Sequence, residues 1–153
     1  MTTPTHTAPE ARDLRALAGV MIPASTAYNV PGADDDLILA DILKSLERDT
    51  ADVRTALAHL AKLAGGAFAD LAPDRRRDVA ATFKQEGGAP LFALNRVVLL
   101  CYYRDDRVMR SLGQEPRSPF PKGHVVEQGD WSLLDPVKKR APMWRRTSKA
   151  TVT

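Results

Sequence analysis

The sequence predicts an all-α protein, a compact bundle of about five to six helices with a long, irregular, proline-rich C-terminal extension. In residues 1–112, apolar side chains recur at spacings of three and four, which is the period of a helix. Only a few residues, such as 124–127, alternate with the period of a strand. Residues 113–153 hold 5 of the 11 prolines, which prevent a continuous helix there. The total of 153 residues suits one ordinary domain.

The first helix is expected over about residues 9–21. Residues 7–10, Thr-Ala-Pro-Glu, have the form of a capping box with proline in the first turn. Pro23 ends this helix, and residues 22–33 are expected to form a loop. The triplet Asp34-Asp35-Asp36 then marks the start of a second helix, because negative charge is favourable at a helix N-terminus.

A third helix is expected to open at Thr50 and Asp52, with the pair Gly65-Gly66 weakening its far end. Its apolar stripe comprises Val53, Leu57, Leu60, Ala61, Ala64 and Phe68. A fourth helix is expected from the pair Pro73-Asp74 to the pair Gly87-Gly88. It should point Val79 and Phe83 inward.

The fifth helix, over about residues 90–103, is apolar almost all round, which predicts a central position in the bundle. The core is expected to combine Leu57, Leu60, Phe83, Leu94, Val98 and Leu99. Asp105 should cap a short sixth helix over residues 106–112, stopped by Gly113. Residues 102–108 are thus expected to form a corner, at which Arg104 or Arg107 pairs with carboxylates of the body or of a partner.

Charge and composition divide the chain into a helical body, residues 1–112, and a C-terminal tail, residues 113–153. The body carries 14 basic and 15 acidic residues, whereas the tail carries 8 and 4 and both tryptophans. Because a tail so rich in large apolar side chains is not typical of a solvated disordered segment, we expect it to bind a partner or to cover its own body. The residues expected to bind the partner are Phe120, Trp131, Leu133, Leu134, Lys138, Lys139, Arg140, Met143, Trp144 and Arg145.

No familiar signature of a cofactor, a metal or a catalytic nucleophile occurs in the sequence. A single cysteine and three scattered histidines cannot supply the ligands of iron–sulfur, haem or Cys/His zinc sites. Phosphate-binding glycine loops and the GxSxG and HExxH patterns are missing. We therefore expect neither a cofactor nor a metal in this chain. The longest apolar run, residues 97–103, is too short to cross a bilayer, so no membrane span is expected.

Four features invite a chemical interpretation, and each has a simpler structural one. His59 is expected to be a surface or core-edge histidine rather than a base, and Cys101 a buried apolar residue rather than a nucleophile. The triplet of residues 34–36 is favoured as a helix cap over a cation site. The basic clusters at residues 75–77 and 138–146 are interpreted as solvated or partner-facing surface, and nucleic acid binding is the less favoured alternative.

Two segments resemble the gluconate 2-dehydrogenase subunit 3 family. Residues 17–24, Leu-Ala-Gly-Val-Met-Ile-Pro-Ala, precede a Pro31-Gly32 loop and an apolar helix. Residues 102–108, Tyr-Tyr-Arg-Asp-Asp-Arg-Val, precede the pair Leu112-Gly113 and a proline-rich tail. The order and spacing of these segments, which frame nearly the whole body, match those of the family.

The resemblance implies a small, non-catalytic helical subunit beside a large FAD-dependent flavoprotein of the glucose–methanol–choline oxidoreductase type. Such a subunit supports the folding, flavin incorporation or export of its partner, which oxidises sugars, sugar acids or other alcohols. FAD is then expected in the partner. The sequence does not indicate whether the electron acceptor is a cytochrome subunit or oxygen. Similar subunits often begin with a twin-arginine export signal, which residues 1–10 lack. A cytoplasmic location is therefore expected, or a periplasmic one if the partner carries the chain across.

The alternative is a free-standing small enzyme. Its pocket would have to be assembled from residues without a sequence signature, and Tyr102, Tyr103, Asp105 and His59 are the least implausible set. An accessory subunit should neither bind FAD nor turn over substrate alone, and this property separates the two hypotheses.

Overall fold

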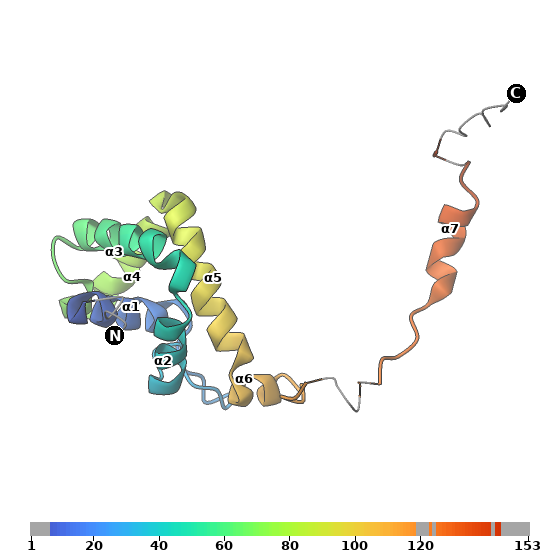
Figure 1. The fold of residues 1–153 in the computed structure, drawn as a ribbon, viewed down its shortest axis with the longest axis horizontal. Helices are drawn as coiled ribbons and strands as arrows, with labels where there is room; N and C mark the ends of the chain where they lie inside the picture. Colours follow the sequence, from blue (N-terminus) through green and yellow to red (C-terminus); the bar gives the residue numbers. More distant parts are fainter. Residues whose placement is uncertain (1–6, 119–122, 124, 142, 145–153) are drawn as a thin grey trace, which may run out of the picture. The chain divides into compact units, whose positions relative to one another are not determined.

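The structure, a computed structural model, describes residues 7–118, 123, 125–141 and 143–144. The chain divides into two compact units, Met1–Arg117 and Ser118–Thr153, which are described separately (Figure 1). The boundary lies five residues beyond the body and tail limits expected from composition.

The first unit is built from helices, and the described residues contain no β-strand beyond one isolated bridge between Ser25 and Val30. The all-α prediction is therefore confirmed. In chain order the elements are α1 (Ala8–Met21), α2 (Asp36–Lys44), the 3₁₀ turn η1 (Glu47–Asp49), α3 (Thr50–Ala64), the 3₁₀ turn η2 (Phe68–Asp70), α4 (Pro73–Glu86), α5 (Gly88–Arg104) and α6 (Asp106–Ser111).

Local capping chemistry sets several of the helix ends. At the start of α1 the amide of Thr7 donates to the Glu10 carboxylate at 2.7 Å, and the amide of Glu10 donates to the Thr7 hydroxyl at 3.4 Å. These two bonds confirm the predicted capping box. At the end of α3, Gly65 has a φ of +72°, a left-handed conformation that glycine adopts without strain. Phe68, expected on the α3 stripe, lies in η2 beyond this break and is still fully buried.

The core is formed where α5 packs against α2 and α3, with α1 and α4 completing it. Five of the six residues predicted to share it are buried, namely Leu57, Leu60, Phe83, Leu94 and Val98. The prediction for Leu99 is wrong, because this side chain is 42% exposed.

The central position predicted for α5 holds for one of its faces only. Its buried face carries Leu94, Val98 and Cys101, whereas Phe92, Leu99, Leu100 and Tyr103 are exposed. Positions 92, 99 and 103 recur at spacings of seven and four and therefore form a second apolar stripe on the opposite side of the helix. Helical periodicity cannot distinguish an apolar face covered by the same chain from one left open.

The loop between α1 and α2 requires a glycine at position 32. The amide of Ala33 donates to the carbonyl of Ile22 at 2.9 Å, which closes the loop onto the end of α1. A Cβ atom at Gly32 would lie 2.9 Å from the backbone nitrogen of Ala24, closer than atoms can pack. The Pro31-Gly32 step is therefore explained by close backbone packing.

The second unit contains two short helical turns where an irregular chain was expected. Asp130 caps the 3₁₀ turn η3 (Trp131–Leu134), which leads into α7 (Asp135–Lys138). Each is four residues long, too short to give a periodic signal in the sequence. Of residues 124–127, which alternate like a strand, residue 124 lies outside the described residues and residues 125–127 have no regular secondary structure. Among all described helices, none is long and apolar enough to cross a membrane.

Candidate functional site

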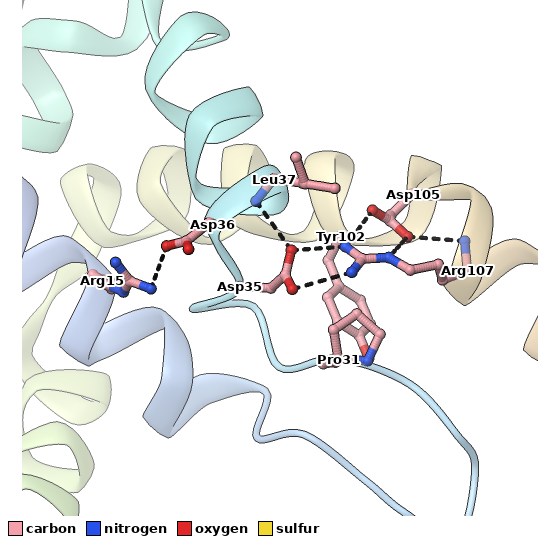
Figure 2. Close-up of polar contacts among 8 residues, drawn as sticks. All are labelled: Arg15, Pro31, Asp35, Asp36, Leu37, Tyr102, Asp105 and Arg107. Atoms are coloured by element: carbon pink, nitrogen blue, oxygen red, sulfur yellow. Dashed lines mark hydrogen bonds and ion pairs between the residues drawn. The ribbon is translucent and has the colours of Figure 1, made fainter.

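The Pro31-Gly32 loop that follows the first resemblance segment meets the second segment, residues 102–108, at one corner of the first unit, where the end of α5 faces the loop before α2 (Figure 2). The Tyr102 hydroxyl donates to the backbone carbonyl of Pro31 at 3.2 Å. Tyr102 is 5% exposed, and burial raises the pKa of its hydroxyl, which therefore stays a donor at neutral pH. The first tyrosine of the segment thus holds the proline–glycine loop against α5.

Arg107 joins two carboxylates at this corner (Figure 2). Its guanidinium binds Asp35 through two nitrogens at 2.7 and 3.1 Å, and Asp105 through two nitrogens at 2.9 and 3.0 Å. Hydrogen bonds from Arg107 hold the pKa of both carboxyl groups below their ordinary value and raise the pKa of Arg107 itself. The corner is therefore a partly buried Asp–Arg–Asp network.

The same two aspartates cap helices. The Asp35 carboxylate accepts from the amide of Leu37 at 3.0 Å at the start of α2. The Asp105 carboxylate accepts from the amide of Arg107 at 2.9 Å at the start of α6, as predicted. Because both caps share one arginine, the N-termini of α2 and α6 are tied together across the corner.

A second arginine extends the contact between α5 and α2. The Arg104 guanidinium binds the Asp41 carboxylate at 2.5 and 2.6 Å and the Ser45 hydroxyl at 2.5 Å. Together with Arg107, it confirms the predicted corner with paired arginines. Its partner, Asp41, could not be identified from the sequence, since the two residues are 63 positions apart. Beside them Cys101 is 1% exposed, which confirms the prediction that it is buried, and burial raises the pKa of its thiol, whose sulfur accepts from Arg104 Nη2 at 3.6 Å.

The acidic triplet acts as a helix start. Asp35 caps α2, and Asp36 binds Arg15 of α1 at 2.5 Å (Figure 2). Both carboxylates thus have partners within the fold. This arrangement agrees with the capping interpretation of the triplet.

The structure does not bring together the set proposed for a free-standing enzyme. The imidazole of His59 contacts Glu86 at 3.4 Å and packs edge-on against the Phe83 ring. Glu86 lies just before α5 begins, whereas Tyr102 lies near its last turn, about 20 Å farther along the helix at 1.5 Å per residue. His59 is thus a core-edge residue, and Tyr102 and Asp105 are engaged in structural contacts.

Most of the tail residues expected to bind a partner are exposed within the second unit. Trp131, Leu133, Leu134, Lys138, Lys139, Arg140, Met143 and Trp144 are all classed as exposed, and both indole side chains are 64% exposed. The indole nitrogen of Trp131 donates to the Gln128 side chain at 3.3 Å. Phe120 and Arg145 lie outside the described residues.

Comparison with known protein families, with curated proteins and with solved structures finds no match for this chain.

Replacing Asp105 by alanine should lower the free energy of unfolding by about 0.5–2 kcal/mol, the usual effect of losing a helix cap. The change removes the acceptor at the start of α6 and one of the two carboxylates on Arg107. Urea unfolding followed by circular dichroism measures the effect. Replacing Asp106, whose contact with Arg110 is exposed on both sides, is the matched control and should change stability by less than about 0.5 kcal/mol. Equal effects of the two substitutions would contradict the capping role.

Proposed function

We propose that this chain is a non-catalytic accessory subunit of a heteromeric FAD-dependent sugar or alcohol dehydrogenase or oxidase. It stabilises or matures a large flavoprotein subunit of the glucose–methanol–choline type, which holds the FAD and performs the oxidation. The observation that carries the proposal is the corner itself, where Tyr102 of the second segment contacts Pro31 in the proline–glycine loop that follows the first segment, and Arg107 contacts Asp35 just beyond that loop. The second segment and the loop that follows the first segment thus belong to one structural feature.

The tail supports the same proposal. Its exposed indoles, Trp131 and Trp144, are the side-chain type most enriched among residues that dominate binding energy at protein interfaces. The lysines and arginine at positions 138–140 place positive charge beside them, which would speed association with an acidic partner. In the proposed complex the tail binds the large subunit through the two indoles.

The first experiment purifies the tagged full-length chain together with the protein that co-elutes with it and records an absorbance spectrum. A flavin spectrum that follows the large chain, with none in the isolated small chain, is expected. The second experiment truncates the chain after Arg117, the end of the first unit. The truncated chain should stay helical and no longer retain the flavoprotein.

Point substitutions test whether the two indoles of the tail bind the flavoprotein. Replacing Trp131 or Trp144 by alanine should weaken binding of the flavoprotein about thirtyfold, because removing such a residue typically costs at least about 2 kcal/mol. Val125, which is fully exposed in the same unit and was not expected to bind, is the control and should leave affinity unchanged when replaced by alanine. A truncated chain that still co-purifies at full stoichiometry would refute the role of the tail. FAD binding or substrate turnover by the small chain alone would refute the proposed function.

A further inference from the structure

We propose that a furrow along α1 and α4 of the first unit binds an acidic, amphipathic segment of a partner protein. The apolar side chains of that segment would lie at the end of the furrow near α5, and its carboxylates at the arginine-rich end. This site is separate from the tail residues to which the proposed function assigns the partner contact. It also does not require the partner to be a flavoprotein.

The basic half of the furrow is a cavity of about 680 Å³ between α1, η2 and the start of α4. Four arginines line it, two from α1 and two from α4, against a single carboxylate, Asp34. The arginines are Arg12, Arg15, Arg76 and Arg77. Guanidinium groups converging on one hollow favour a ligand that carries several carboxylates.

Three of these arginines are held by partners that are easily exchanged. Arg12 pairs with Asp70, Arg15 with Asp36 and Arg77 with Asp74, and both side chains are largely exposed in each pair. Exposed pairs contribute little to stability, so an incoming carboxylate can replace the present one at small cost.

Arg76 is different, because no carboxylate neutralises it among the described residues. Its Nη2 donates to the backbone carbonyl of Ala69, which is uncharged. Its Nε is buried and has no hydrogen-bond partner within the described part of the chain. Buried polar groups are nearly always satisfied in native proteins. A guanidinium at the wall of an open cavity that no carboxylate of the described residues neutralises favours an anionic ligand.

The other half of the furrow is mostly apolar and has a volume of about 490 Å³. It lies between α1, α4 and α5, and its walls include Val20, Ala81, Leu91 and the partly exposed Leu99. The cations Arg77 and Lys84 border it. Because Leu99 belongs to the exposed apolar stripe of α5, this half of the furrow extends onto that stripe.

The two halves are adjacent, because two residues line both of them. Val20 of α1 and Arg77 of α4 line both cavities. Along α4 the lining positions are 73, 76, 77, 80, 81, 83 and 84, which recur at helical spacing and span about 16 Å at 1.5 Å per residue. A peptide segment of about three helical turns matches this length.

The chemistry of the furrow favours a peptide over other anions. Inorganic phosphate could use only the basic half. A single-stranded nucleic acid needs exposed aromatic rings on which bases stack, and the one aromatic residue of the furrow, Phe83, is 1% exposed. A segment with both apolar side chains and carboxylates complements both halves.

The test measures binding of a fluorescent synthetic peptide, with leucines at one end and glutamates at the other, to the full-length chain. Arg77→Glu should weaken binding about tenfold or more, because it reverses the one charge that both halves share. Arg75→Glu is the matched control, since Arg75 is an exposed neighbour that lines neither cavity, and should change affinity less than about twofold. Circular dichroism checks that both variants keep their helices.

Replacing the leucines of the peptide by serine, or its glutamates by glutamine, should each abolish binding. The proposal is overturned if the peptide fails to bind, or if Arg75→Glu weakens binding as much as Arg77→Glu does. It is also overturned if the serine peptide or inorganic phosphate competes as well as the original peptide, which would indicate a general anion site. A wild-type dimer that Arg77→Glu converts to a monomer in size-exclusion chromatography would assign the furrow to a second copy of the chain.

Discussion

Val98→Asp is expected to unfold the first unit. Val98 is 0% exposed and lies on the face of α5 that packs in the core with Leu57, Leu60 and Leu94. A carboxylate at this position would have no partner and would be removed from water, at a cost of several kcal/mol or more. The total stability of a domain is about 5–15 kcal/mol, so most of it would be lost.

Thermal unfolding followed by far-ultraviolet circular dichroism measures this effect. Leu100→Asp is the matched control, since Leu100 lies two residues away on α5 and is 54% exposed. It should melt within a few degrees of the wild type, because surface substitutions change stability by only about 0.5 kcal/mol. A Val98→Asp variant that melts at the wild-type temperature would contradict the assignment of α5 to the core.

The features predicted correctly from the sequence are those that neighbouring residues determine. The capping box at Thr7, the caps at Asp35 and Asp105 and the break of α3 at Gly65 each depend on residues within one helical turn. Apolar spacing along a single helix also predicts the buried Val53, Leu57 and Leu60 of α3 and Val79 and Phe83 of α4, although Ala61 and Ala64 of the predicted stripe are only half-buried and the buried Ala56 was not expected. Such signals lie within a short window of sequence, so they can be recognised without knowledge of the fold.

The features that could not be predicted depend on contacts between distant residues. The need of Arg104 and Arg107 for carboxylates could be foreseen, but Asp41 and Asp35 lie 63 and 72 positions away. The furrow between α1 and α4 is formed only when these helices pack. Leu99 is exposed because the other helices cover the opposite side of α5. Since α5 carries apolar residues on both sides, the sequence does not indicate which side is covered. At these positions the packing of helices, rather than local preference, decides the outcome.

Arg107→Gln is expected to lower the free energy of unfolding at pH 7 by about 2 kcal/mol, between the values for exposed and buried ion pairs. The substitution removes the charge that joins Asp35 to Asp105 and leaves two partly buried carboxylates facing each other. It also releases the contact between the loop before α2 and the start of α6. Arg110→Gln, in the same helix, removes a pair that is 61% exposed on both sides and should cost less than about 0.5 kcal/mol.

The stability difference between the wild type and Arg107→Gln should also depend on pH, in a direction that the pKa values of Asp35 and Asp105 determine. In the wild type the pKa values of Asp35 and Asp105 lie below their ordinary value, mainly through hydrogen bonds from Arg107. Their contribution to stability is therefore present above the unfolded pKa of about 4 and is lost as the pH falls below it. In Arg107→Gln only the backbone amides at the two helix starts still lower these pKa values, so acidification should destabilise the variant less than the wild type. Urea unfolding at a series of pH values should show the gap between the two proteins narrowing below about pH 4. A gap that stays constant with pH, or that equals the effect of Arg110→Gln, would show that the Asp–Arg–Asp network does not stabilise the corner.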